Sequence, residues 1–110
     1  MLHARPGVAS LETGFINKVV EVQGVGHRYV TYVPREYDAE EAWPLVVFLH
    51  GAGERGDDGL KQTEVGIGKA VRLHPDRFPC LIVMPQCPEK SWWDTEAEQV
   101  EAVVRQVTEE

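Results

Sequence analysis

The chain has 110 residues, of which 43% are hydrophobic and 26% are charged, and such values are typical of a single globular domain. Its net charge of −7 argues against binding to nucleic acid or to anionic membranes, because both require clustered Lys and Arg. No run approaches the roughly 20 apolar residues of a membrane span, and residues 1–6 lack the apolar core of a secretion signal, so a cytoplasmic location is the default expectation.

The first half of the chain predicts three strands. Residues 1–14 show no periodic pattern and are expected to form an N-terminal arm. Residues 15–22 and 27–33 are rich in Val, Tyr and Thr and predict strands, and the Gly-Val-Gly sequence at 24–26 predicts the turn that joins them as an antiparallel hairpin. Residues 45–49 form an unbroken apolar run, which is typical of a central strand buried on both faces.

The second half predicts a glycine-rich loop, a helix and another buried strand. The loop covers residues 50–64 and follows the apolar run directly. Residues 67–74 have helical spacing of apolar positions, and Pro75 ends that helix. The apolar run at 80–84 predicts the next strand, which is closed by the Pro-Gln-Cys-Pro sequence at 85–88.

The last helix has the clearest pattern in the sequence. Apolar residues recur at helical spacing from Ala97 to Val107, and Thr95 and Glu98 have the spacing of a capping box at its start. The chain ends on glutamates, which are unfavourable at the negative end of a helix dipole. We therefore expect that the natural chain continues beyond Glu110 or that this end arises by cleavage.

The two cysteines, Cys80 and Cys87, lie at either end of an apolar run. If that run is extended, their Cα atoms are roughly 20 Å apart, whereas a disulfide requires less than about 7 Å. Both are therefore expected to be free thiols. The His and Cys residues show no metal-ligand spacing, and neither a metal nor another cofactor is expected.

The order of these elements resembles the N-terminal half of an α/β-hydrolase. More narrowly, the chain is similar to serine esterases related to phospholipase/carboxylesterases, feruloyl esterases and polyhydroxybutyrate-depolymerase-like enzymes. The likeness spans residues 15–110 and rests on residues 32–34, 44–56, 83–88 and 92–93. It implies an α/β fold in which an antiparallel leading hairpin precedes parallel strands with flanking helices, and a partial domain that lacks the half with the nucleophile.

The resemblance also implies a role for the loop sequence His-Gly-Ala-Gly-Glu-Arg-Gly. In such hydrolases the loop after the third strand donates a backbone N–H to the oxyanion of the reaction, and the matching donor here is the N–H of Ala52. Gly51 and Gly53 would let the backbone approach the ligand; alternatively, they only make a tight turn. His50 is not expected to be the catalytic base, because that histidine comes last in the chain order of the fold; it is expected to brace the loop through its ring nitrogens.

Four further side chains are candidates for substrate binding. Glu54 and Arg55 could contact the substrate, or they could pair within the loop and hold its turn. Trp92 or Trp93 could line an acyl or aromatic pocket, because aromatic rings bury a large area at low entropic cost; alternatively, both pack in the core or at its rim. The sequence does not decide which tryptophan has this role, and it leaves phospholipid, feruloyl, acetyl-sugar and polyester substrates open.

The nucleophilic half of the site is absent from the sequence. The only serines are Ser10 and Ser91, and neither lies in a Gly-x-Ser-x-Gly elbow. One hypothesis is therefore a split carboxylesterase whose Ser-His-Asp triad is carried by a second polypeptide, or completed through a swapped homo-oligomer. The alternative is a non-catalytic, truncated hydrolase-fold module that associates with itself. The exposed apolar edge of an incomplete parallel sheet favours a partner in both cases.

Overall fold

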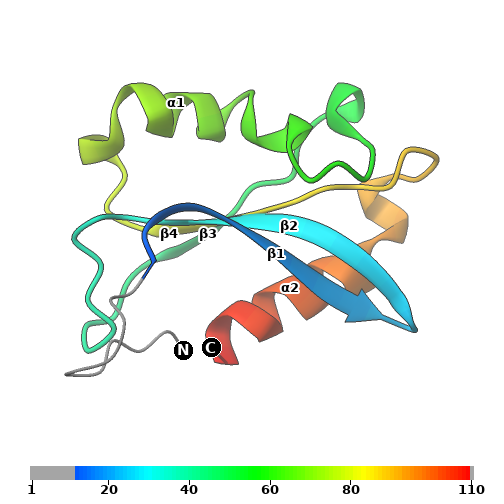
Figure 1. Ribbon diagram of the computed structural model, residues 1–110. Coiled ribbons are helices and arrows are strands. Elements are labelled where there is room, and N and C mark those ends of the chain that lie inside the picture. The colour runs from blue at the N-terminus through cyan, green and yellow to red at the C-terminus, as the bar shows by residue number, and fades with distance from the viewer. Residues whose placement is uncertain (1–11, 110) are drawn as a thin grey trace.

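The computed structural model describes residues 12–109 and has a mixed sheet at its centre, with strands in the order β1-β2-β4-β3 (Figure 1). β2 is antiparallel to β1 and to β4, whereas β3 and β4 are parallel. The predicted leading hairpin and the parallel strand pair are both confirmed, while the antiparallel pairing of β2 with β4 was not predicted. The strands are β1 (Gly14–Val22), β2 (Val25–Val33), β3 (Leu45–Val47) and β4 (Leu81–Pro85).

Residues 1–11 of the predicted N-terminal arm (1–14) lie outside the described residues. The last residue of that arm, Gly14, already begins β1. Glu110 also lies outside the described residues.

The hairpin turn lies one position earlier than the sequence predicts. Val22 pairs with Val25, so the turn consists of Gln23 and Gly24 alone. Both have positive φ, 51° and 80°, which matches the twist that a two-residue hairpin requires. The predicted turn at 24–26 is wrong because its last two residues already pair in β2.

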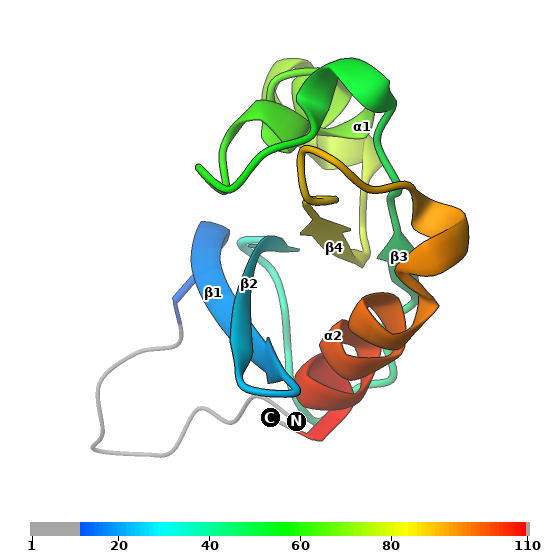
Figure 2. The same ribbon diagram turned by 90° about the vertical axis from the view of Figure 1, so that its right-hand side faces the viewer.

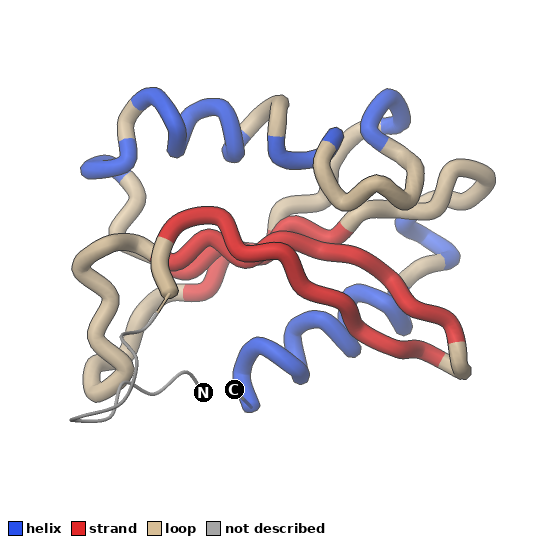
Figure 3. The backbone as a smooth tube through the Cα atoms, viewed as in Figure 1, coloured by secondary structure: helices blue, strands red, loops and turns tan. Residues whose placement is uncertain are grey.

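Two helices cover opposite faces of the sheet (Figures 1 and 3). They are α1 (Ile67–Leu73) and α2 (Ala97–Glu109), and both were predicted from their apolar spacing. Each helix closes its own core against one face, and β4 contributes to both because its side chains alternate between the faces. The α2 core contains Val20, Tyr29, Val83, Val103 and Val107; the α1 core contains Val30, Tyr32, Val71, Ile82 and Met84.

β3 is shorter and more exposed than predicted for residues 45–49. Regular pairing ends at Val47, and one further hydrogen bond of 3.0 Å joins the Phe48 N–H to the Val83 carbonyl oxygen. In the described sheet β3 is an edge strand (Figure 2), and Val47 and Leu49 are 36% and 43% exposed. The prediction of a central strand buried on both faces is therefore wrong for this chain: the apolar run indicates what the strand can bury, and the described residues hold no strand that covers its outer edge.

The predicted capping box is also wrong. Thr95 belongs to a short 3₁₀ helix, Trp93–Thr95, and its hydroxyl donates to the Trp92 carbonyl oxygen at 3.0 Å. The carboxylate of Glu98 accepts hydrogen bonds of 3.1 Å from the side chain of Gln23 in the hairpin turn. The two side chains thus serve other contacts and do not cap α2.

Gly68 in α1 is required by close packing, and we expect Gly68→Ala to destabilise the protein. A Cβ at this position would lie 2.2 Å from the carbonyl oxygen of Thr63, which is rigid backbone. Alanine normally stabilises a helix by about 1 kcal/mol relative to glycine, but the clash should turn this into a loss of about 1–3 kcal/mol. Urea unfolding measures the change, with Lys69→Ala at an exposed position of the same helix as control. An increase in stability for Gly68→Ala would contradict the packing.

Candidate functional site

The loop after β3 lies at the carboxyl end of the parallel strand pair. β3 and β4 run in the same direction, so the segments that follow Val47 and Pro85 meet at one edge of the sheet. A short 3₁₀ helix, Ala52–Glu54, forms within the first segment. A hydrogen bond of 3.0 Å from the Gly56 N–H to the Cys87 carbonyl oxygen joins the two segments. In open α/β sheets this edge is where ligands bind.

His50 is buried and braces this edge, as predicted from its place in the chain. Its Nε2 accepts a hydrogen bond of 2.9 Å from the backbone N–H of Cys87, and its Nδ1 lies against the carbonyl oxygen of Gly51. The carbonyl oxygen of His50 accepts a further bond of 2.9 Å from the indole N–H of Trp93. Both ring nitrogens are thus engaged with the backbone, and neither is available to activate a nucleophile.

The two tryptophans have different surroundings. The ring of Trp93 packs edge-on against the imidazole of His50, with 5.0 Å between the ring centroids. Trp92 is 58% exposed, and the guanidinium of Arg55 lies 4.3 Å from the centre of its ring. Trp93 therefore helps to hold the loop, whereas Trp92 presents a large aromatic surface beside it.

The backbone of the 3₁₀ helix is bonded to its own loop except at two amides. The Gly51 N–H donates to the Glu54 carboxylate at 3.1 Å, and the Glu54 N–H donates to the Gly51 carbonyl oxygen at 3.3 Å. Ala52 and Gly53 are exposed, and no hydrogen bond between described residues uses the N–H of either. Two exposed residues therefore keep backbone donors that no described residue uses, in a loop whose other contacts hold it in place.

Arg55 ties this loop to the segment after β4. Its Nε–H donates to the carbonyl oxygen of Ala52 at 3.0 Å, and a terminal N–H donates to the carbonyl oxygen of Ser91 at 3.2 Å. The side chains of Glu54 and Arg55 thus make contacts within the site, and substrate contacts by either of them stay a prediction.

Gln86 is a structural residue that sequence reasoning missed. Its buried amide donates at 2.9 Å to the carbonyl oxygen of Glu54 and to the carboxylate of Asp58, and accepts at 2.7 Å from the N–H of Gly59. The backbone carbonyl oxygen of Gln86 accepts a hydrogen bond of 2.9 Å from the side-chain amide of Gln99 in α2. The available signals were its position directly after an apolar strand and its place in the Pro-Gln-Cys-Pro sequence, but its partners are distant in sequence.

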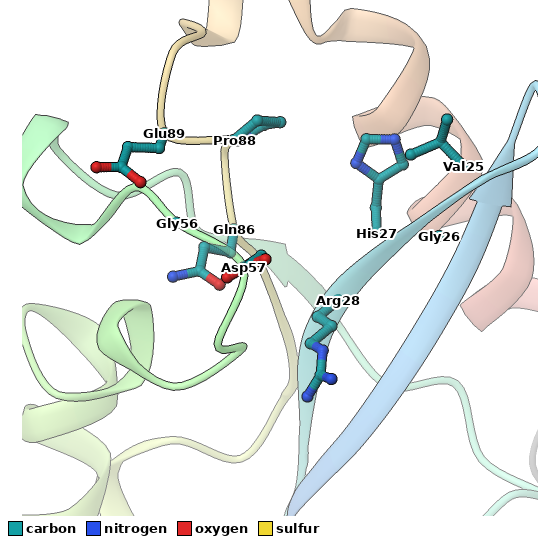
Figure 4. Close-up of a pocket in the computed structure, with 9 residues that line it drawn as sticks. All are labelled: Val25, Gly26, His27, Arg28, Gly56, Asp57, Gln86, Pro88 and Glu89. Atoms are coloured by element: carbon teal, nitrogen blue, oxygen red, sulfur yellow. The ribbon is translucent and has the colours of Figure 1, made fainter.

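A pocket of ≈ 440 Å³ lies between the start of β2 and the segments at 56–57 and 86–89 (Figure 4). His27 extends from β2 on one side of the pocket, and Gln86 and Asp57 line it from the two later segments. None of the residues predicted for the site lines this pocket. The pocket adjoins the loop at 50–64 through Gly56 and Asp57, and neither Ala52 nor Gly53 lines it.

Asp58 gives this region a pH dependence. The hydrogen bond from the Leu60 N–H, together with that from the Gln86 amide, lowers the pKa of Asp58 from its ordinary value of 3.8. The stability that this carboxylate contributes is therefore present above pH 3.8 and is lost as the pH falls through the lower, folded-state pKa. We expect Asp58→Asn to lose less stability than the unmodified protein when the pH falls from about 5 to about 2. Urea unfolding midpoints at the two pH values provide the test, and equal losses would contradict it.

Both cysteines are free thiols, as predicted. Burial raises the pKa of the Cys80 thiol and is also the main cause of the raised pKa of Cys87, so both are in the protonated, less nucleophilic form at neutral pH. Within residues 12–109, no three His, Cys, Asp or Glu side chains are grouped closely enough to hold a metal ion.

Ser91 has no histidine partner among residues 12–109. Its hydroxyl donates to the Glu96 carboxylate at 2.7 Å and lies 3.0 Å from the Thr95 hydroxyl. Ser10 lies outside the described residues. The described part of the chain therefore presents backbone donors without a Ser-His pair to use them.

One solved structure that this chain resembles is that of a thermostable esterase, with 36% sequence identity and a TM-score of 0.60. The likeness covers 72% of this chain and 22% of the esterase, so the chain spans about a fifth of the length of that neighbour. No protein-family model and no curated protein matches the chain. No helix in the described region is long and apolar enough to cross a membrane. The mixed sheet with its two flanking helices thus resembles a fragment of an esterase-like hydrolase fold.

Proposed function

We propose that this chain supplies the oxyanion loop and part of the substrate cleft of a carboxylic ester hydrolase. The observation that carries the proposal is that Ala52 is exposed and that its N–H has no hydrogen-bond partner among the described residues, in a loop that is otherwise held by hydrogen bonds. Attack on an ester turns its carbonyl oxygen into an oxyanion, and a fixed backbone N–H stabilises this charge more than it stabilises the neutral ester. The likeness to a thermostable esterase supports the same assignment.

A second polypeptide would carry the Ser-His-Asp triad. Ser91 bonds to Glu96, and both ring nitrogens of His50 are occupied, so these residues do not form a nucleophile and its base. Val47 at the end of β3 and Leu49 just beyond it are both exposed, and β3 is an edge strand of the described sheet. This supports docking of another polypeptide there, because an unpaired strand edge readily accepts a further strand. The triad would then lie beside the amide of Ala52.

Trp92 would form part of the cleft wall. It is the more exposed of the two tryptophans, and its ring is held by Arg55, the same side chain that bonds to the carbonyl oxygen of Ala52. A flat aromatic surface beside the oxyanion donor suits the apolar acyl or alcohol group of an ester.

Labelling with a fluorophosphonate, which reacts with activated serines, tests the proposal. The protein is purified under native conditions, labelled, and separated on a denaturing gel, while hydrolysis of a nitrophenyl ester is measured on the same sample. A second band that takes the label, together with ester hydrolysis that the probe abolishes, supports the proposal; a heat-denatured sample should remain unlabelled. A single unlabelled band without hydrolysis would overturn it, and a multimeric mass of that sample would favour the self-associating, non-catalytic module.

A further inference from the structure

The surroundings of His50 select one tautomer of its ring. The side chain is 5% exposed, and its Nε2 accepts a hydrogen bond of 2.9 Å from the backbone N–H of Cys87. A ring nitrogen that accepts a hydrogen bond carries no proton, so the neutral imidazole has its proton on Nδ1. Nδ1 faces the carbonyl oxygen of Gly51 and therefore donates to it. Cys87 thus keeps the ring in the form that can hold Gly51.

The carbonyl group of Gly51 sets the direction of the Ala52 N–H. The two groups belong to one peptide unit, and in a trans peptide they point in opposite directions; no peptide bond of the described chain is cis. The Gly51 oxygen is held by the Nδ1–H of His50 and by the N–H of Glu54 at 3.3 Å, both within the loop. The Ala52 N–H must therefore point away from these donors, and Ala52 is an exposed residue whose N–H has no hydrogen-bond partner among the described residues.

We propose that His50 is a positioning residue that directs the Ala52 N–H at the ester oxygen. It does so by donating a hydrogen bond to the Gly51 carbonyl oxygen, on the opposite side of the same peptide unit. This inference rests on the proposed esterase function and assigns to His50 no proton transfer. Its Nδ1–H donates to the loop, whereas its Nε2 only selects the tautomer through Cys87. The two ring nitrogens therefore have separable roles, and a pair of substitutions can divide them.

Asparagine and glutamine each retain one of the two nitrogen contacts. The side-chain amide of Asn lies near the position of Nδ1 and can still donate to Gly51, whereas the oxygen of Gln reaches the position of Nε2 and can still accept from Cys87. In the assembled enzyme we expect His50→Ala and His50→Gln to lower kcat by about 100-fold with little change in KM, because the donor is misaimed. His50→Asn should recover most of that loss in kcat, although its urea midpoint falls because the Cys87 N–H loses its acceptor.

Nitrogen-15 NMR of the chain tests the inference independently of the esterase reaction. The expected spectrum shows His50 protonated on Nδ1 with a bare Nε2, and it shows an Ala52 amide resonance that moves in His50→Gln but stays near its original position in His50→Asn. A proton on Nε2, or equal shifts of Ala52 in both variants, would overturn the positioning role. Recovery of kcat by Gln and not by Asn would overturn it as well. Absence of ester hydrolysis in the unmodified assembly would count against the proposed function, while these NMR results would still decide the role of His50.

Discussion

Ala52→Pro should lower the kcat of the assembled esterase by about 100- to 1,000-fold, since loss of one oxyanion donor typically costs about 3–4 kcal/mol of transition-state stabilisation. Proline removes the N–H of residue 52 and leaves its carbonyl group in place for Arg55. Nitrophenyl ester hydrolysis with the partner polypeptide present and no fluorophosphonate added measures the loss. The KM should change little, because the N–H acts on the charge that develops after binding.

The backbone at this position suits a proline. Gly51 has φ −82° and ψ −177°, the extended conformation that a residue before proline prefers, and Ala52 is the first residue of a helical turn, where proline is favoured. The folded chain should therefore keep its urea midpoint. Gly53→Ala serves as a matched control, because it keeps every N–H and its Cβ would have no atom within 4 Å. Full activity in Ala52→Pro, or an equal loss in Gly53→Ala, would contradict the role of the Ala52 amide.

Gln86→Leu should destabilise the protein by about 3 kcal/mol, which is a large part of the stability of a small domain. Leucine would fill similar space but leave the Gly59 N–H and the Glu54 carbonyl oxygen without their partner. Such an unpaired buried group costs about 1–3 kcal/mol. Urea unfolding gives the change in free energy, and faster hydrogen exchange at the Gly59 amide would locate it in the loop.

Two further substitutions make this expectation specific. Asn17→Leu replaces an amide by leucine at an exposed position of β1 and should change the free energy of unfolding by less than about 0.5 kcal/mol. In the unmodified protein the Asp58 carboxylate accepts a hydrogen bond of 2.9 Å from the Gln86 amide. Gln86→Glu keeps the shape of the side chain, but at neutral pH it replaces this donor by a carboxylate oxygen that repels Asp58. It should therefore also destabilise. Stability equal to that of the unmodified protein in Gln86→Leu would show that water replaces these bonds.

The sequence predicts the elements of this fold better than their limits. The distribution of apolar and β-branched residues identifies both helices and all four strands, because it reports which faces can be buried. It does not show whether the strand at 45–49 has a neighbour on each side, and β3 is an edge strand for that reason. The capping-box spacing at Thr95 fails similarly, since a hydroxyl that could cap α2 is used inside a 3₁₀ turn.

The candidate site likewise has a part that the sequence predicts and a part that only the folded structure shows. The likeness of the loop to hydrolase sequences is sufficient to nominate Ala52 and to remove His50 as a base. The contacts of Gln86 with Glu54, Asp58 and Gly59 span 27 to 32 residues, so they exist only once the strands are in register. The separation of Trp92 from Trp93 likewise depends on which indole reaches His50, a property of the folded loop.

The pairing of β2 with β4 has a consequence for the order of folding. Tyr29 pairs with Pro85, and Tyr32 with Ile82, so the centre of the sheet joins segments that are far apart in the chain. The β1–β2 hairpin closes over a two-residue turn and can form early, but a lone hairpin is only marginally stable in water. During synthesis on the ribosome, the edge of β2 that pairs with β4 therefore stays unpaired until β4 has emerged. An unpaired strand edge favours aggregation during this interval.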